Sequence, residues 1–427
     1  MNQIIEKAAA SAQNPQSGNP IYQARWQRFM DCVALKQPDR MPVGLFASFW
    51  YAKYGGITCR DFMYDQEKVK EIAAKALVEL QPDIISAPLL FSMGQVLDAF
   101  GYKQLQWPGH GAGDNRGFQY LDREYMRAEE YDDFLLDPTG FYLRTYLPRI
   151  AEAFEGFKDF PNVSGLHYLQ LMPGMRPFGM PSLRKSLEQV TAATEKINRL
   201  LRNHIEFTGH IAALGFPYHS GVTCGAPYDV VADYFRGATG MMKDMFRHKD
   251  KLLEVIDRMG IFLLRNTIEQ AAVSRHPVVF MPLHWHGDNF MSDEKFRTFF
   301  WPSLRRFMLG LIDAGLIPMV VWEGVCTKRL EVIGDIPAGK CVYWFENTDM
   351  VKAFEVLGDV VALRGNVSAS VMVTGKPEEV DAEVRHLVEK VFNRGGKLIL
   401  DGANGISEDA PVENVRAMFK AARKYAG

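Results

Sequence analysis

The segments VVFMPLHWHGDN (278–289) and IPMVVWEG (317–324) decide the fold class of this chain. Each is a short apolar run that ends in polar residues, and the helix-forming stretch DEKFRTFFWPSLRRFMLGLIDAG (293–315) separates them. Apolar runs of this length are typical of strands that are buried on both faces of a parallel sheet, and a helix is the usual connection between such strands. The pair therefore predicts a βαβ unit.

The same alternation extends along most of the chain and predicts eight strands. Helical stretches such as EKVKEIAAKALVEL (67–80) and PEEVDAEVRHLVEKVFNRGG (377–396) lie between the apolar runs. Eight strands with intervening helices are what a closed α/β barrel needs, so we expect a single (β/α)₈ TIM barrel. The expected strands are 41–47, 84–90, 217–223, 278–285, 317–323, 340–346, 360–366 and 397–402.

Three segments lie outside this pattern. Residues 1–24 include a stretch rich in Ser, Asn, Pro, Gln and Gly, so we expect a flexible tail there, before a barrel domain at 25–427 that begins with a helical extension. Residues 101–195 contain many aromatic residues and few strand signals. We interpret them as an inserted loop region with some helix over the barrel mouth, in which 163–171 is a candidate extra strand.

Composition excludes several classes of protein. The 427 residues are 47% hydrophobic and 23% charged, which is the balance of a globular protein with a large core. Lys and Arg (49) nearly balance Asp and Glu (51), so no basic field exists for nucleic acid or an anionic membrane. We expect a small-molecule substrate or a protein partner.

The cysteines and the N-terminal sequence indicate a cytoplasmic protein. No CxxC spacing occurs among the five cysteines, which suits free thiols in a reducing compartment. The first 20 residues lack the apolar stretch of a signal peptide, and no apolar run approaches 18 residues. The cysteines are Cys32, Cys59, Cys224, Cys326 and Cys341.

Polar residues recur where the predicted strands end, and in α/β barrels the chemistry gathers there. Glu323, His286 and Asp401 are the candidates for catalysis. A helix cap, a bond to loop backbone or a core position would explain any one of these residues, but their recurrence on successive strands favours a site. The candidates for substrate binding are Tyr218, His219, Trp285, Asp288, Trp322, Asn366 and Asn404.

Two features suggest a metal or an acid at this end. If His284 and His286 both lie in a strand, they share one face and could bind one metal ion together with Glu323. The alternative is that 286 lies in the loop and one histidine belongs to the core. Glu323 follows a buried strand, where desolvation would raise its pKa enough for a general acid.

Five blocks of sequence, in order, resemble the uroporphyrinogen decarboxylase superfamily and together cover most of residues 25–425. That superfamily contains the decarboxylase of haem biosynthesis and the cobalamin-dependent methyltransferases. The blocks are RWQRFMDCVALKQPDRMPV (25–43), GAPYDVVADYFRGATGMMKDMFRHKDKLLEVID (225–257), DNFMSDEKFRTFFWPSLRRFM (288–308), GNVSASVMVTGKPEEVDAEVRHLVEKV (365–391) and ILDGANGISEDAPVENVRAM (399–418).

The chain differs from both the decarboxylases and the methyltransferases at the motifs that are typical of each. The decarboxylase binds substrate carboxylates with an arginine-rich motif, MRQAGR, but the matching stretch GLFASFWYAKYGG (44–56) has one Lys and no Arg. Its GHGI histidine falls on Asn404. The methyltransferases are implied to bind zinc through a His-x-Cys pair and a later Cys, but Val321, Glu323 and Asn404 stand at those positions. The usual zinc set is therefore absent, and whether another Zn²⁺ site exists is left open.

The resemblance implies a corrinoid-dependent methyltransferase, which moves a methyl group between a small methylated substrate and a corrinoid-binding protein. A methoxylated aromatic or an amine would suit the aromatic residues near the rim, although core or lid roles explain most of these residues equally well. The rival is a decarboxylase that acts on an aromatic or heteroaromatic acid. The sequence does not decide the direction of methyl transfer or whether the chain forms a homodimer.

Overall fold

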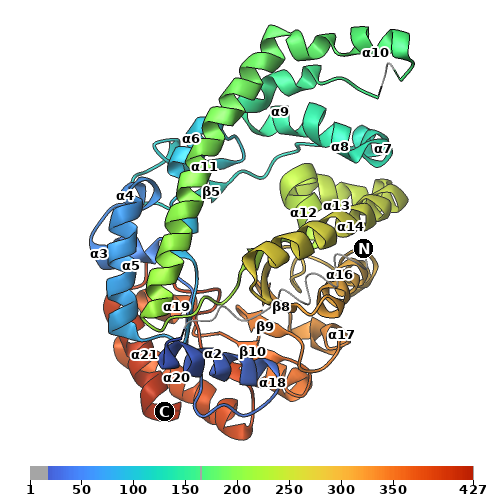
Figure 1. The fold of residues 1–427 in the computed structure, drawn as a ribbon. Coiled ribbons are helices and arrows are strands. Elements are labelled where there is room, and N and C mark those ends of the chain that lie inside the picture. Colours follow the sequence, from blue (N-terminus) through green and yellow to red (C-terminus); the bar gives the residue numbers. More distant parts are fainter. Residues whose placement is uncertain (1–17, 164–165, 427) are drawn as a thin grey trace.

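The computed structural model describes residues 18–163 and 166–426 and contains two parallel sheets (Figure 1). Six strands pair in the order β11-β10-β9-β8-β7-β6, and β1 pairs with β2. Each of the eight segments predicted to be strands contains one of them. The strands are β1 (Gly44–Leu45), β2 (Ile84–Ile85), β6 (Val222–Thr223), β7 (Val278–Leu283), β8 (Ile317–Trp322), β9 (Val342–Phe345), β10 (Ala362–Arg364) and β11 (Leu398–Ile399).

Isolated parallel bridges join the two sheets at both edges. Val43 pairs with Leu400 beside β11, and Ile85 of β2 pairs with Tyr218, which precedes β6. The backbone N–H of Gly44 also donates to the carbonyl oxygen of Leu400 at 2.7 Å. The predicted α/β class with parallel strands is confirmed, and the eight strand segments follow one another as parallel neighbours.

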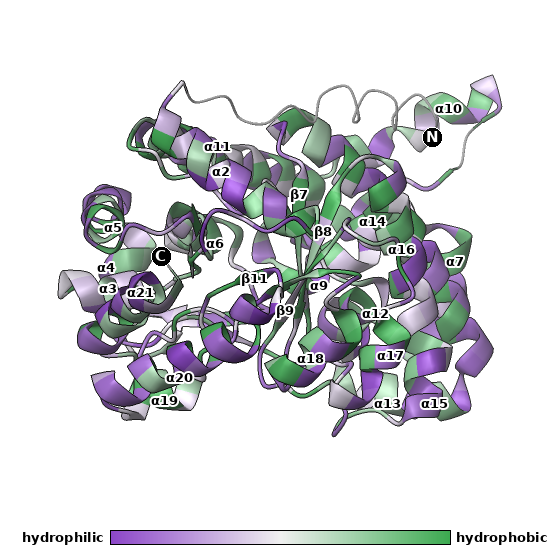
Figure 2. Cartoon of the chain, turned by 90° about the horizontal axis from the view of Figure 1, so that it is seen from below, coloured by the Kyte–Doolittle hydropathy of each residue, from purple (hydrophilic) through white to green (hydrophobic). Residues whose placement is uncertain are grey.

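Amphipathic helices cover the outer faces of the strands. In α20 (Pro377–Lys390) the buried residues are Val380, Val384, Leu387 and Val388, which form one stripe at helical spacing. Figure 2 shows the same division, with apolar segments toward the strands and polar ones outside. The other helices around the strands include α3 (Trp50–Gly55), α4 (Cys59–Tyr64), α5 (Gln66–Leu80), α6 (Gly94–Phe100), α12 (Pro227–Val231), α13 (Gly237–Arg247), α14 (Lys249–Ser274), α16 (Trp301–Asp313), α17 (Leu330–Ile333), α18 (Met350–Leu357), α19 (Ala369–Thr374) and α21 (Val412–Ala426).

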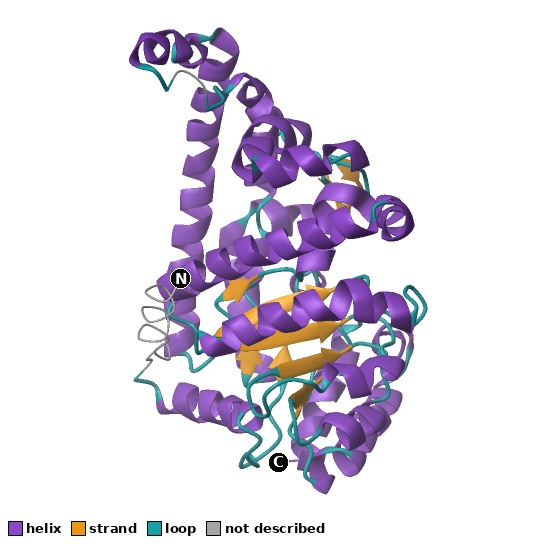
Figure 3. Cartoon of the chain, turned by 90° about the vertical axis from the view of Figure 1, so that its right-hand side faces the viewer, coloured by secondary structure: helices purple, strands orange, loops and turns teal. Residues whose placement is uncertain are grey.

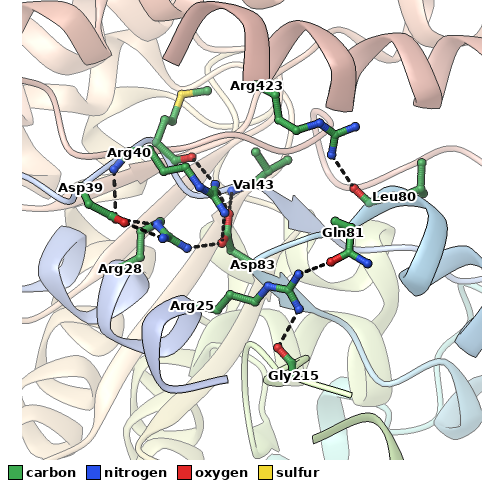
Figure 4. A network of polar contacts seen from close by, with 11 residues as sticks. Arg25, Arg28, Asp39, Arg40, Val43, Leu80, Gln81, Asp83, Gly215 and Arg423 are labelled. Carbon is green, nitrogen blue, oxygen red and sulfur yellow. Dashed lines mark hydrogen bonds and ion pairs between the residues drawn. The ribbon is translucent and has the colours of Figure 1, made fainter. Parts of the chain in front are cut away.

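Helix α2 (Pro20–Val33) begins inside the segment 1–24 that the sequence assigns to a tail, because Asn19 caps it and accepts a hydrogen bond from the backbone N–H of Ile21. Residues 1–17 of that segment lie outside the described residues. Arg28 on α2 binds Asp39 and Asp83 at 2.6 Å each, and Arg40 also binds Asp83 (Figure 4). This network fixes the chain where it enters β1, at the end of the strands opposite to the predicted site.

The inserted region 101–195 is mainly helical. A three-stranded sheet of β3 (Leu105–Pro108), β4 (Gly111–Ala112) and β5 (Gln119–Tyr120) is followed by α7 (Tyr131–Leu136), α8 (Pro138–Phe141) and α9 (Leu147–Ile150). The 33-residue helix α11 (Pro181–Ala213) then runs along one side of the molecule and returns the chain to the strands (Figures 1 and 3). The sequence did not indicate a helix of this length.

The candidate extra strand at 163–171 is wrong. Tyr168–Gly174 form helix α10, whose N-cap residue, His167, accepts a hydrogen bond from the backbone N–H of Leu169. No residue of α10 is buried, so its alternating apolar residues have no sheet to join. Residues 164–165 lie outside the described residues. Within the described residues, no helix is long and apolar enough to cross a membrane.

Candidate functional site

Side chains on the strand faces that point away from the surrounding helices lie at two levels. Phe280 on β7 contacts Phe46, which follows β1, and Trp344 on β9, with ring centroids 5.3 and 6.4 Å away. Neither of these residues lies on a strand next to β7, so Phe280 points inward. Because side chains alternate along a strand, His284 four residues later continues the same face beyond the end of β7. We call the level of Phe280 the floor cluster and the level of His284 the rim cluster.

The rim cluster is built around His284 and consists of this residue with Asp229, Asp233, Glu323 and Glu346. The Nδ1 of His284 lies 2.6 Å from Oδ2 of Asp233, and its Nε2 lies 3.9 Å from Oε1 of Glu323. Both side chains of the His284–Glu323 pair are about one third exposed, at 38% and 33%. The two carboxylates therefore flank one accessible imidazole.

Helical geometry places the two aspartates. Asp229 on α12 and Asp233 on the π-helical turn η6 (Ala232–Arg236) are four residues apart, so they share one helix face. Asp229 is 1% exposed and accepts hydrogen bonds from the backbone N–H groups of His284 (3.0 Å) and Trp285 (3.3 Å). Asp233 also accepts from the indole Nε1 of Trp285 at 2.6 Å. The helix after β6 thus anchors the loop after β7.

The electrostatics of the rim cluster favour a protonated imidazole. Burial opposes the charged form, but the hydrogen bond to Asp233 and the charges of Asp229, Asp233 and Glu323 outweigh it and raise the pKa of His284 to about 9. Burial opposes the charged forms of the acids as well, and it raises the pKa values of Asp229 and Glu323 above their usual values. Proton donors are therefore available at neutral pH.

Glu346 and Asn366 extend the rim cluster across the next strands. The backbone N–H of Gly324 donates to the carboxylate of Glu346, which follows β9. The side-chain amide of Asn366, after β10, donates to the backbone carbonyls of Glu346 (3.2 Å) and Thr348 (2.8 Å). Asn366 thus fixes the loop that carries Glu346. Asn404, also predicted for the site, is exposed and lies in the loop after β11.

His286 does not join His284, contrary to the predicted metal pair. Strand β7 ends at Leu283, so the period of two fails in the loop and His286 points the other way. Its ring is fully buried against Trp322 (5.0 Å) and Phe300 (5.9 Å), and its nitrogens make no hydrogen bond of good geometry. Burial and the charge of Arg329 lower the pKa of His286 to about 3, so it is neutral.

No zinc site forms from these side chains. Among the residues that the structure describes, no three His, Cys, Asp or Glu side chains are arranged to hold a metal ion. The tentative set of His284, His286 and Glu323 therefore does not fit a metal ion. Of the remaining predicted residues, Trp322 is fully buried on the outer face of β8, and Asp288 accepts a hydrogen bond from the backbone N–H of Lys328 at 2.9 Å. Trp322 therefore belongs to the core, and Asp288 fixes loop backbone.

The floor cluster consists of His219, Arg364 and Asp401 with the rings of Phe46, Phe280 and Trp344. Arg364 and Asp401 are both 0% exposed and pair at 2.6 Å. The second guanidinium nitrogen of Arg364 lies 2.9 Å from Nδ1 of His219, and the guanidinium carbon lies 3.8 Å from the ring centroid of Trp344. Asp401, predicted as catalytic, is thus neutralised by Arg364, and among the described residues it makes no hydrogen bond or ion pair with the rim cluster.

The sequence analysis did not select four residues that form the two clusters. They are Asp229, Asp233, Glu346 and Arg364. The spacing of Asp229 and Asp233 on a helix directly after a predicted strand was a usable signal. Arg364 and Glu346 also stood at strand ends. Tyr218, which was selected, packs its ring against His204 of α11 (5.5 Å) instead of joining His219.

Parallel strands surrounded by helices, with an acid–imidazole cluster where the strands end, are typical of α/β enzymes. The sequence model described as "Uroporphyrinogen decarboxylase (URO-D)" matches residues 184–425, more than half of the chain. The chain belongs to the uroporphyrinogen decarboxylase family.

Relatives and solved structures agree with this family. The chain is 23% identical over 255 residues to uroporphyrinogen decarboxylase of Mannheimia succiniciproducens, covering 58% of this chain and 66% of that protein. It is 26% identical over 243 residues to that of Dechloromonas aromatica, covering 56% and 64%. The chain thus spans just under two thirds of the length of these relatives. A methyltransferase from Methanosarcina mazei has the same fold, with a TM-score of 0.58, 15% identity, and coverage of 93% of this chain and 98% of that one.

Proposed function

We propose that this chain is a single (β/α)₈-barrel methyltransferase, which moves a methyl group between a small methylated substrate and a corrinoid carried by a separate protein. The two bridges that connect β1 and β2 to the larger sheet support the closed barrel. The five cysteines are free, which suits the reducing cytoplasm. The inserted region at 101–195 would then lie beside the barrel mouth.

The row Asp233–His284–Glu323 is the observation that carries the proposal. Methyl ethers and amines are poor leaving groups unless the heteroatom is protonated. Asp233 fixes His284 through Nδ1, so its Nε2–H points toward Glu323 and the accessible side. A proton held between His284 and Glu323 is then available to the substrate heteroatom when the bond from this atom to the methyl carbon breaks. The corrinoid would supply the nucleophile that accepts the methyl group.

The charge of the rim cluster favours methyl transfer over the rival decarboxylation of an acid. Four carboxyl groups surround one imidazole, and the loop after β1 (44–56) contains no Arg. The positive charge of Arg364 in the floor cluster is already balanced by Asp401. The protonated His284 is already paired with Asp233 at 2.6 Å. A substrate carboxylate would therefore find no unpaired cation among these groups and would meet the acidic side chains of Glu323 and Glu346 instead.

A two-armed assay tests the proposal. The chain is incubated with methylcobalamin and separate panels of thiols, amines and phenols, and loss of the methyl–cobalt absorbance is recorded. In the second arm, release of CO₂ is measured from aromatic and heteroaromatic carboxylic acids. We expect transfer in the first arm and no CO₂ in the second. Decarboxylation of any of the acids without methyl transfer would establish the rival function.

A further inference from the structure

The floor cluster contains a buried imidazole whose function the methyl-transfer step does not explain. We infer that Nε2 of His219 donates a hydrogen bond to a neutral oxygen acceptor on a flat substrate ring, which lies on Phe46 and Phe280. The inference deepens the proposed function, because it rests on that function for the place of the methyl group and names the substrate class: a neutral methoxylated aromatic with a second oxygen acceptor opposite its methoxy group.

The contact between Arg364 and His219 fixes the tautomer of the imidazole. A guanidinium group has only donors, so Nδ1 of His219, 2.9 Å from Nη1 of Arg364, must accept. The proton of the neutral ring is therefore on Nε2. Burial and the charge of Arg364 lower the pKa of His219 well below its usual value, so a second proton does not bind. His219 is a fixed donor through Nε2.

This donor has no partner in the protein. His219 is 4% exposed, and its Nε2 makes no hydrogen bond with any described residue. The ring nitrogens of His286 are fully buried. Nε2 of His219 is not, so a ligand in the interior can reach it. Nearly all buried donors in proteins are satisfied. A ligand that accepts a hydrogen bond would satisfy this one.

The neighbours of His219 select a flat and uncharged ligand. Phe46 and Phe280 are only partly buried, and their ring centroids lie 5.4 and 5.2 Å from the imidazole. Their faces provide an apolar surface for a ring. Arg364 and Asp401 compensate each other, so an ionised group on the ligand would be desolvated without a counter-charge. A ketone, aldehyde or ether oxygen avoids this cost.

The strands set the distance between the floor cluster and the rim cluster. His284 follows Phe280 by four residues and lies just past the end of β7, and Glu346 follows Trp344 by two residues and lies just past the end of β9. At about 3.3 Å per residue, the two levels are separated by roughly 7–13 Å along the strands. One aromatic ring with substituents at opposite ends spans this distance. Its acceptor would reach His219 when its methoxy group lies beside His284 and Glu323.

Equilibrium binding to the purified full chain tests the inference without methyl transfer. The probes are 4-methoxyacetophenone and 1-isopropenyl-4-methoxybenzene, which have the same shape but differ in the carbonyl oxygen. Isothermal titration calorimetry should show about tenfold tighter binding of the ketone, as expected for one hydrogen bond. Similar affinities for the two probes, or no binding of either, would overturn the inference.

Variants of His219 locate the donor. His219→Asn keeps an acceptor for Arg364 but removes Nε2, so it should abolish the preference for the ketone. His219→Gln restores a donor and should recover part of it. The matched control is His276→Asn, since His276 is another buried histidine, which precedes β7, and both its ring nitrogens already have backbone partners. It should retain the preference. Loss of the preference in His276→Asn, or its persistence in folded His219→Asn, would refute the assignment.

The two proposals fail in different ways. If methylcobalamin is never consumed but the ketone preference depends on His219, only the methyl-transfer function is wrong. If methyl transfer proceeds but the probes bind equally, only the role of His219 is wrong.

Discussion

At the scale of single residues, His284 is the group whose charge state controls the rim cluster. Its pKa is raised to about 9, so it is protonated at neutral pH and loses its proton as the pH rises through 9. We therefore expect kcat/KM for methyl transfer to fall above about pH 9. Glu323→Gln removes one of the charges that raise this pKa and should move the descending limb to lower pH. A limb that does not move would show that another group titrates.

Glu323 is expected to be the side chain with the largest effect on turnover. Glu323→Gln keeps the shape but removes the carboxyl group that shares a proton with His284. If proton donation to the leaving heteroatom is its role, kcat should fall by about 10²-fold, whereas KM changes less. Single-turnover transfer from a methylated substrate to the corrinoid protein measures this step. A rate near that of the wild type would mean that His284 acts alone.

His286 provides the contrasting test, because the sequence selected it and the structure buries it away from the rim cluster. Its ring packs against Trp322 and Phe300, so an apolar replacement of similar size keeps these contacts. His286→Leu should therefore keep kcat within a few-fold of the wild type, with thermal unfolding as the check on folding. A loss as large as that of Glu323→Gln would restore the predicted catalytic role.

At the scale of elements, the strands could be predicted and the ends of the strands could not. Each buried run, such as IPMVVW, is apolar on both faces because helices cover one side and the interior covers the other. The pairing of His284 with His286 required the strand period to continue past Leu283, where β7 ends, and the alternative of a loop position with a core histidine applies instead. The spacing of Asp229 and Asp233 indicates that they share a helix face, but their pairing with the loop after β7 is a tertiary contact that this local pattern does not encode.

Strand β1 has a position that only glycine can occupy. A Cβ atom on Gly44 would overlap the carboxylate of Asp401 and press on Arg364. Gly44→Ala should therefore disturb the buried ion pair and lower the free energy of unfolding by about 1–3 kcal/mol or more, as overpacking does. Denaturant unfolding measures the change. The control is Gly113→Ala, because Gly113 is exposed with no neighbouring atom, and its stability should stay within about 0.5 kcal/mol.

At the scale of the whole molecule, the inserted region 101–195 shows what else the sequence left undetermined. Its aromatic residues and weak strand signals predicted an elaboration, but α11 depends on packing against distant segments. Asn203 on this helix donates to Gln66 of α5 at 2.5 Å, and Leu183 is fully buried. Such contacts join segments more than 100 residues apart. The position of this layer therefore follows from the folded chain rather than from any local motif.

The arrangement of charge over the two clusters predicts which substrate of the family this chain rejects. Uroporphyrinogen carries eight carboxylates, and holding it requires several unpaired cations. In the rim cluster the one cation, protonated His284, is paired with Asp233 and stands beside Glu323 and Glu346, and the arginine of the floor cluster is paired with Asp401. Arg28 and Arg40 are bound to aspartates at the opposite end of the strands. We expect no conversion of uroporphyrinogen to coproporphyrinogen, measured by chromatography of the oxidised porphyrins with fluorescence detection. Phe46→Lys should not create decarboxylation of uroporphyrinogen, because one cation cannot balance eight negative charges. Conversion above the level of a heat-treated sample would mean that cations outside the two clusters bind the substrate.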